Sequence, residues 1–257
     1  MSAAAAEPSI LLLQIRAPWH GAALRQEAAC FRELCGVGEA ALTAVNLVEH
    51  PRLRWADVEP YDVVMVGGAG SHSVTHEYAF TGPLAEVVRR LVDEGRPFLG
   101  SCWGHQFLAW VLGGRVVTDA AREEVGSFTV HLTEPGRRDP LFAGLPSSFP
   151  AHLGHHDLVV ELPAGMVELA RTAACPNQAI RVAGKPAYGT QFHLEMTSAR
   201  MRERLKMYSA EYLPADDLDA ELDRLLCPTP EAETLLGRFL TIAAGGMVSS
   251  IAESRPG

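Results

Sequence analysis

Short apolar runs alternate with helix-like segments through the first hundred or so residues, and this alternation constrains the fold more than any other feature. The runs are SILLLQI, LTAVNLV, YDVVMVGGAG and RPFLG, at residues 9–15, 42–48, 61–70 and 96–100. Residues 21–35 and 82–95 have helical apolar spacing and end near Gly36 and Gly95. Strands joined through helices form parallel sheets, so the sequence predicts an α/β fold with a mostly parallel central sheet.

The pattern changes after residue 114. Between 115 and 192 it consists of strand-like pieces separated by Pro and Gly, namely RVV, SFTVHL, LVVEL, VELA, QAIRV and AYGTQF, with no clear helix. These pieces predict an antiparallel or mixed extension of the sheet. The last sixty or so residues are acidic and helical in pattern, and we expect the tail SSIAESRPG to be frayed. We interpret residues 1–257 as one domain, with a core at about 9–196 and a helical extension at about 197–257.

Composition excludes several classes of function. With 47% hydrophobic residues, the 257-residue chain can bury a large core. A formal net charge of −9 argues against general binding to nucleic acid or to an anionic membrane. The N-terminal MSAAAAEPSI has no basic residue and ILLLQI is too short for a signal sequence or a membrane span, so we expect a cytoplasmic protein. The odd number of cysteines, five, is typical of free thiols.

One segment, GSCWGHQFLA at residues 100–109, combines a strand end, a cysteine and a helical run. A strand that turns abruptly into a helix strains its apex residue, and glycines at positions 100 and 104 would remove colliding side chains. Cys102 would then lie at a helix N-terminus, which favours its thiolate, and the Trp103 N–H could donate to a developing oxyanion. From this segment alone Cys102 is either such a nucleophile or a small buried structural residue.

A thiolate nucleophile needs a base and a group that orients the base. In YGTQFHLEMT, His193 and Glu195 lie two residues apart at the end of an apolar strand, so both side chains point the same way. Glu195 could accept from one imidazole nitrogen while the other faces a thiol. Without Cys102, the same pattern describes a strand-end histidine beside a solvated glutamate.

Taken together, these segments resemble the class I glutamine amidotransferases. GSCWGHQFLA is similar to the family's Gly-x-Cys-x-Gly-x-Gln motif, and GTQFHLEM is similar to its Gln-Phe-His-Pro-Glu motif. VGGAGS resembles its Gly-Gly-Pro-x-Ser loop, and LGHHDLV resembles its His-x-Asp loop. The order and approximate spacing agree over about residues 9–196, and the chain resembles a stand-alone amidotransferase domain of the kind found in GMP synthase. The resemblance implies a flavodoxin-like three-layer sandwich with a central, mostly parallel sheet, an antiparallel extension and C-terminal helices.

The resemblance also implies a reaction and its residues. Cys102 would attack the side-chain amide of glutamine to form a γ-glutamyl thioester. His193 would act as base and then as acid toward the leaving ammonia, and Glu195 would orient it. The backbone N–H groups of Gly68 and Trp103 would hold the oxyanion.

Further positions would bind the substrate. Gly70 and Gln106 would help to seat glutamine, and the loop Gly154, His155, His156 and Asp157 would place its backbone against it. The implied reaction needs no cofactor and no metal. His72 and His76, and the crowded histidines from residue 152 to 156, could be imagined as a zinc site, but they lack a matching ligand motif. We expect the segment SHSVTHEYAF to form a loop over the site, with Tyr78 and Phe80 as packing or substrate contacts.

Three positions depart from the family pattern and leave the substrate open. Ala69 and Leu194 replace prolines, and His156 stands where a small residue is common. The leading hypothesis is an amidotransferase that releases ammonia for a separate ATP-dependent synthetase, since the chain has no phosphate-binding glycine loop. The alternatives are a γ-glutamyl peptidase that acts on a larger γ-glutamyl compound, and a non-catalytic binding or regulatory protein.

Overall fold

A nine-stranded sheet runs through the molecule. The computed structural model describes residues 7–209 and 217–253, with side chains described as far as residue 245. The sheet order is β2-β1-β3-β4-β11-β10-β9-β6-β7. The parallel part contains β2 (Leu42–Asn46), β1 (Ile10–Ile15), β3 (Val63–Ala69), β4 (Phe98–Ser101) and β11 (Ala187–Thr190). The antiparallel part contains β10 (Ala179–Val182), β9 (Met166–Arg171), β6 (Glu124–Leu132) and β7 (Ser148–His155).

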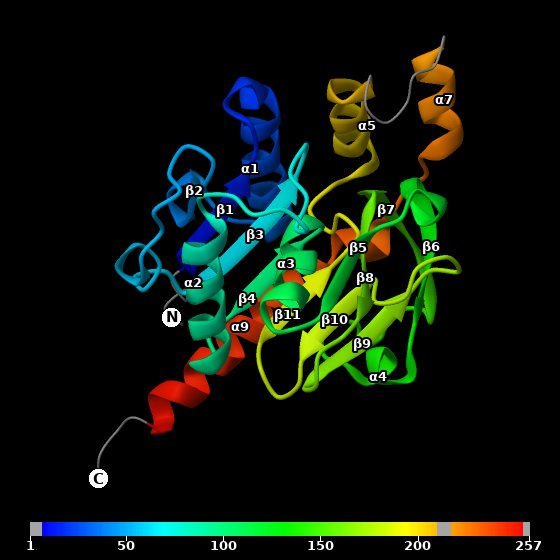
Figure 1. Cartoon of the computed structure of the whole chain (residues 1–257). Helices are drawn as coiled ribbons and strands as arrows, with labels where there is room; N and C mark the ends of the chain where they lie inside the picture. Colours follow the sequence, from blue (N-terminus) through cyan, green and yellow to red (C-terminus); the bar gives the residue numbers. More distant parts are fainter. Residues whose placement is uncertain (1–6, 210–216, 254–257) are drawn as a thin grey trace.

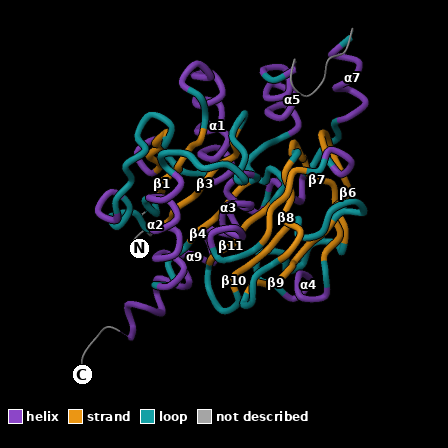
Figure 2. Tube along the Cα trace, viewed as in Figure 1, coloured by secondary structure: helices purple, strands orange, loops and turns teal. Residues whose placement is uncertain are grey.

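Helices cover both faces of the parallel part (Figures 1 and 2). On one face lie α1 (Gly21–Cys35) and α9 (Leu235–Glu253), and on the other lie α2 (Thr81–Asp93) and α3 (Trp103–Val111). Phe31 of α1 and Phe239 of α9 share a core with Leu12 of β1, whereas Leu13 points to the other core and packs with α2 and α3. Successive strand residues therefore feed opposite cores, as expected of a strand buried on both faces. The predicted three-layer fold is confirmed.

Smaller elements complete the chain. Strands β5 (Arg115–Thr118) and β8 (Asp157–Glu161) form a separate antiparallel pair. The remaining helices are α4 (Glu134–Arg138), α5 (Ser198–Met207), α7 (Leu218–Leu225) and α8 (Pro230–Glu233), with short 3₁₀ turns at Pro18–His20, Glu39–Ala41, Trp55–Asp57 and Ala120–Arg122. None of the helices within the described residues is long and apolar enough to cross a membrane.

The structure adds three details to the predicted elements. Strand β7 alternates Phe149, Ala151 and Leu153, which enter one core, although it was not among the predicted strands, and it contains Pro150, which an edge strand tolerates because one side of its backbone is unpaired. Helix α4 occupies a region where no helix was expected, and Thr133 caps it by accepting from the Gly136 N–H. Helix α9 continues to Glu253 into the tail expected to fray, and residues 254–257 lie outside the described ranges.

The carboxyl ends of β1, β3, β4 and β11 meet at one edge of the sheet. These four strands are parallel neighbours, so the residues that follow them are brought together. Arg16 follows β1, Gly70 follows β3, Cys102 follows β4, and Gln191 follows β11. Ligands of open α/β sheets bind at this edge, and the predicted site lies here.

Candidate active site

The turn between β4 and α3 is strained as predicted. Cys102 has φ 51° and ψ −101°, a conformation that residues with a side chain rarely adopt. A Cβ on Gly100 would lie 2.3 Å from the backbone carbonyl of Gly104, and one on Gly104 would lie 2.3 Å from the Val66 carbonyl oxygen. Both glycines are therefore required by close backbone approach, and the turn holds Cys102 at the N-terminus of α3.

Two polar groups contact the Cys102 sulfur. The thiol lies 3.8 Å from the Gly154 carbonyl oxygen, and the Gln191 side-chain amide donates to the sulfur at 3.7 Å. Gln191 was missed in the sequence analysis, although it stands inside the quoted GTQFHLEM motif. A buried cysteine that serves only as packing needs neither of these contacts.

His193 and Glu195 form a buried pair beside Cys102. The Nδ1 of His193 lies 2.7 Å from Oε1 of Glu195, and the other carboxylate oxygen accepts from the Ser101 hydroxyl at 2.7 Å. The strand was expected to reach this pair, but β11 ends at Thr190 and the pair lies in the following loop. Ser101, the neighbour of the cysteine, gave no signal in sequence because its partner is 94 residues away.

Electrostatics distinguish His193 from an ordinary buried histidine. Burial alone would lower the pKa of His193, but the charges and hydrogen bonds of Glu195 and Cys102 raise it to about 10. Burial would raise the pKa of Glu195, but the neighbouring His193 charge lowers it, helped by hydrogen bonds from His193 and Ser101. The arrangement favours an imidazolium held between a carboxylate and a sulfur, which is the state that keeps a thiol reactive.

His105 has the opposite environment. It is fully buried in α3, its ring packs on Gly189, and neither ring nitrogen has a hydrogen bond of good distance and angle among the described residues. Burial lowers the pKa of His105 to about 3. Although His105 stands only three residues from Cys102 in the motif, it is a neutral packing residue.

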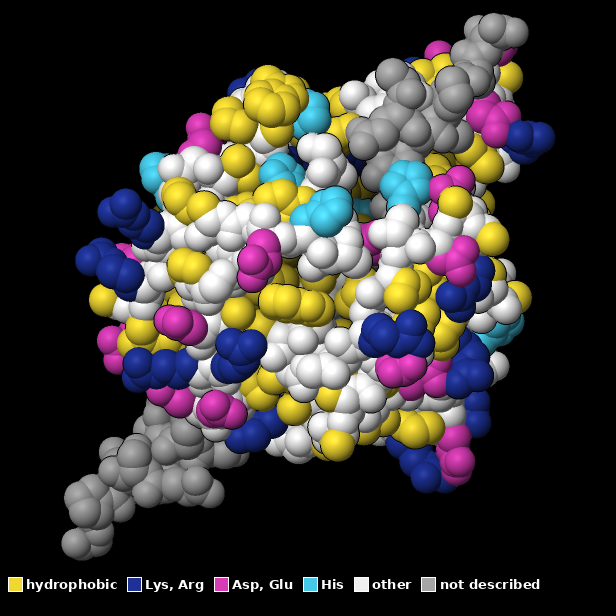
Figure 3. Space-filling view, in the orientation of Figure 1, with side chains coloured by type: hydrophobic (Ala, Val, Ile, Leu, Met, Phe, Trp, Pro, Cys, Tyr) yellow, Lys and Arg dark blue, Asp and Glu magenta, His cyan; other side chains and the backbone are white. Residues whose placement is uncertain are grey.

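A cavity of about 330 Å³ opens beside Cys102. Histidine side chains gather in the upper half of the face drawn in Figure 3. The histidines that line the cavity are His72, His76, His155 and His156. The predicted substrate positions that line it are Gly70, Trp103, Gln106, Gly154, His155, His156 and Asp157. Among the predicted substrate and oxyanion residues, Gly68 is not part of this lining.

Gly68 differs from its predicted role. Its backbone N–H donates to Oε1 of Glu27 at 3.1 Å, so in this conformation it does not point to an oxyanion at Cys102. Glu27 is itself fully buried and paired with Arg16, 2.8 Å away. Gly68 nevertheless lies next to His193 and Cys102, since a Cβ there would come within 3.3 Å of the His193 ring and 3.7 Å of the Cys102 Cβ. The Trp103 N–H lies in the first turn of α3, where backbone donors have no partner one turn earlier.

Gln106 and Asp157 fix one wall of the cavity. The Gln106 amide nitrogen donates to the Asp157 backbone oxygen at 2.8 Å and to Gln191 Oε1 at 3.0 Å. The Asp157 carboxylate accepts from Ser73 and Thr118. The wall therefore has a fixed arrangement of hydrogen bonds that does not depend on a ligand.

The loop from residue 71 to 80 lies against the same cavity, as expected. Ser71, His72, Ser73 and His76 line it. Tyr78 stacks on Phe80 with ring centroids 5.3 Å apart, and Phe80 packs edge-on against Trp103. Tyr78 and Phe80 thus brace the loop by packing rather than by lining the cavity.

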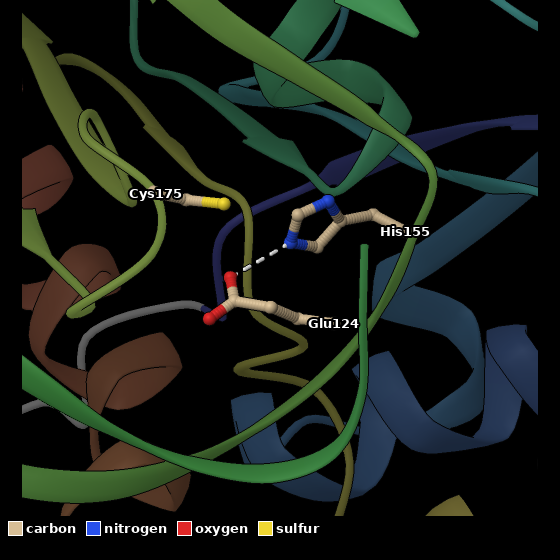
Figure 4. A group of neighbouring side chains, drawn as sticks. All are labelled: Glu124, His155 and Cys175. Carbon is tan, nitrogen blue, oxygen red and sulfur yellow. Dashed lines mark hydrogen bonds and ion pairs between the residues drawn. The ribbon is translucent and has the colours of Figure 1, made fainter. Parts of the chain in front are cut away.

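His155 belongs to a buried polar group behind the cavity wall. Glu124, His155 and Cys175 have donor atoms that all lie within 4.8 Å of one another (Figure 4). The Nε2 of His155 lies 3.1 Å from Glu124 Oε2, which also accepts from Gln178, and the Nδ1 of His155 lies 3.0 Å from the Asp157 backbone oxygen. Burial raises the pKa of Cys175 to about 12, with a smaller contribution from Glu124, which keeps it a thiol. Hydrogen bonds thus hold the group together and anchor the backbone of Asp157.

Comparisons with known proteins agree with this geometry. The model of the family described as "Glutamine amidotransferase class-I" matches residues 30–208. GMP synthase [glutamine-hydrolyzing] of Listeria innocua is 37% identical over 153 residues, which cover 59% of this chain and 27% of that protein. The corresponding protein of Shewanella sediminis is 27% identical over 205 residues, covering 75% of this chain and 37% of that protein. The matches thus span only about a quarter to a third of these relatives' lengths.

Solved structures show the same fold. A glutamine amidotransferase from Thermotoga maritima superposes with a TM-score of 0.70 at 20% identity, covering 91% of this chain and 97% of that one. A glutamine amidotransferase from Methylobacillus flagellatus gives a TM-score of 0.69 at 20% identity, covering 92% and 95%.

Proposed function

The chain belongs to the class I glutamine amidotransferase family, and on this premise we propose that it hydrolyses γ-glutamyl amides through Cys102, His193 and Glu195. Glutamine is the simplest such substrate, and its hydrolysis releases glutamate and ammonia. The observation that carries the proposal is the buried His193–Glu195 pair beside a cysteine held at a positive φ. A packing cysteine would not require the strain of such a backbone conformation.

The first half of the reaction forms a thioester. The Cys102 sulfur attacks the γ-carbonyl carbon, and His193 holds the proton that the thiol has lost. The C–N bond then breaks, and the leaving nitrogen takes that proton from His193. Glu195 stabilises the imidazolium throughout, since it stays 2.7 Å from Nδ1.

The second half releases glutamate. Water gives a proton to His193 and attacks the thioester carbon, and the C–S bond breaks to regenerate Cys102. The Trp103 N–H holds the oxyanion in both halves. An oxyanion site with two donors would require the Gly68 N–H to leave Glu27, to which it donates here.

The cavity of about 330 Å³ would hold the glutamyl part. Gly70 and Gln106 would seat it, and the backbone of residues 154–157 would lie along it. Ammonia would be consumed by a separate ATP-dependent synthetase, and the resemblance to GMP synthases favours such a partner.

A γ-glutamyl peptidase is the second candidate, and one observation favours it. A second, small cavity borders His193 and shares lining residues with the larger one. It would receive whatever is attached to the leaving nitrogen, and free glutamine carries nothing there.

Steady-state turnover tests the proposed chemistry. The purified chain is incubated with L-glutamine and then with γ-glutamyl peptides, and glutamate and ammonia are measured. Acid-quenched samples are analysed by mass spectrometry for a γ-glutamyl adduct on Cys102. If wild type and Cys102→Ala are equally inactive with every substrate and bind them equally well, the non-catalytic alternative replaces the proposal.

A further inference from the structure

Two cavities meet at the Cys102–His193 pair. The larger is lined by Cys102 and the smaller, of about 30 Å³, is lined by His193. They share Ala69, Gly70 and Gly154 and are therefore adjacent. The smaller cavity has room for a group of the size of one carboxylate or one or two water molecules.

The proposed reaction indicates which part of the substrate each cavity would hold. The acyl carbon must reach Cys102, and the leaving nitrogen must reach His193, which gives it a proton. A glutamyl group in the larger cavity therefore directs any substituent on that nitrogen into the smaller one.

Arg204 of α5 lines the smaller cavity and is only 6% exposed. Its Nε donates to the Gln26 side-chain oxygen at 2.6 Å. Its Nη2 is buried and has no hydrogen-bond partner among the described residues. A buried guanidinium N–H without an acceptor is costly, because its hydration has been lost without replacement.

The carboxylates near Arg204 are committed to other groups. Glu27 is paired with Arg16, and Glu195 is bonded to His193 and Ser101. No ion pair joins Arg204 to a carboxylate within the part of the chain that the structure describes. Burial and the nearby Arg16 charge lower the pKa of Arg204, which is the signature of a cation short of an opposite charge. An anionic ligand would supply both the missing charge and the missing acceptor.

We propose that this cavity binds the carboxylate of an amino acid whose amine is joined to the γ-carboxyl group of glutamate. The enzyme then takes γ-glutamyl amino acids as well as glutamine, and Arg204 determines this specificity. The inference rests on the proposed hydrolysis of γ-glutamyl amides. Arg16, which is paired with Glu27, and Tyr208 also line this cavity, and the Tyr208 hydroxyl accepts from Arg16 Nη1 at 3.1 Å.

Two substrates that differ only in charge test the proposal. γ-Glutamylglycine carries the carboxylate, and γ-glutamylglycinamide has the same shape without it. We expect wild-type kcat/KM to be at least about tenfold higher for γ-glutamylglycine, as is typical of hydrogen bonds to a charged group. Both substrates give the same thioester, so the ratio reports leaving-group recognition alone. Equal kcat/KM values for the two substrates overturn the proposal.

Variants identify the responsible residue. Arg204→Gln should bring the ratio close to one, and Arg204→Lys, which retains a cation, should give an intermediate ratio. Arg200→Gln is the matched control: it removes the same charge one turn earlier on α5, where Arg200 pairs with Glu33 and Glu203 at the surface. It should leave the ratio unchanged. A loss of activity on both substrates in parallel, with an unchanged ratio, assigns Arg204 a structural role and overturns the proposal.

A binding measurement separates this inference from the proposed hydrolysis. Calorimetry with Cys102→Ala should show at least about tenfold tighter binding of γ-glutamylglycine than of γ-glutamylglycinamide. If no substrate is turned over but this preference is present, the carboxylate site stands and the hydrolysis fails. If all substrates are turned over and neither measurement shows a preference, the hydrolysis stands and the site fails.

Discussion

Two segments meet at Cys102, the proposed nucleophile, and each contains a buried histidine. In residues 100–109, the backbone sets the geometry, because glycines allow a strained turn. Burial lowers the pKa of His105, beside this turn, to about 3. In residues 190–196, side chains set the charge state. His193 is also buried, but Glu195 and Cys102 raise its pKa to about 10. A histidine close in sequence to the proposed nucleophile is therefore not favoured as a base, whereas a histidine beside a buried carboxylate is.

The largest expected effects come from removing the proposed nucleophile or the proposed base, one from each segment. Cys102→Ala should lower glutamate release from glutamine by about 10⁵-fold or to background, because no thioester can form. His193→Ala should have a comparable effect, and the double variant should be no worse than either single one, since the two groups act as a unit. If the fold loss in kcat of the double variant equals the product of the two single losses, the two segments act independently.

Glu195→Gln should have the next largest effect. The neutral amide introduced at position 195 cannot stabilise the imidazolium, so kcat should fall by about 10²- to 10³-fold. The pKa of His193 should fall as well, and iodoacetamide should alkylate Cys102 more slowly at neutral pH than in wild type. Wild-type alkylation and turnover in this variant would mean that Glu195 does not set the charge state of His193.

The same pair predicts a pH dependence of stability. The folded pKa of His193, about 10, lies above the unfolded value of about 6.5, so its charged form stabilises the fold fully below pH 6.5. This contribution should be lost as the pH rises toward 10. Urea unfolding at intervals between pH 6.5 and 10 should show a falling free energy of unfolding, with a smaller decrease in Glu195→Gln.

Gly100→Ala tests the backbone side of the comparison. The new Cβ would lie 2.3 Å from the Gly104 carbonyl, so the turn must open. We expect the free energy of unfolding to fall by about 3 kcal/mol or more, measured by urea denaturation. Gly82→Ala is the control, because a Cβ there has no neighbour within 4 Å and should change stability little.

His105→Leu should have the smallest effect. Its ring makes no hydrogen bond in the structure, so an apolar side chain of similar size removes a polar group that is buried without a partner. We expect kcat/KM with glutamine to stay within about threefold of wild type and stability to be equal or higher. A loss comparable to that of Glu195→Gln would make His105 a participant in the reaction.

Features that depend on a few adjacent residues could be predicted from sequence. The strained turn at Cys102 follows from glycines two residues on either side, and the pairing of His193 with Glu195 spans only two residues. The α/β fold was predictable for a similar reason, because apolar alternation decides which short segments are strands. Strand β7 was not predicted although Phe149, Ala151 and Leu153 alternate along it, because Pro150 and Gly154 are residues typical of turns and its pairing with β6 joins segments far apart along the chain.

Tertiary structure decided the rest. Glu195 meets Ser101 across 94 residues, Gly68 donates to Glu27 across 41, and Arg16 reaches Tyr208 across 192. Each of these contacts depends on which strand carries its loop to the shared edge of the sheet. The sequence by itself determined which cysteine lies on a strained turn and which histidine has a carboxylate beside it. Only the packed structure decided where the Gly68 N–H points and that Arg204 is buried without a counter-charge, because such contacts depend on the positions of distant elements and not on local sterics.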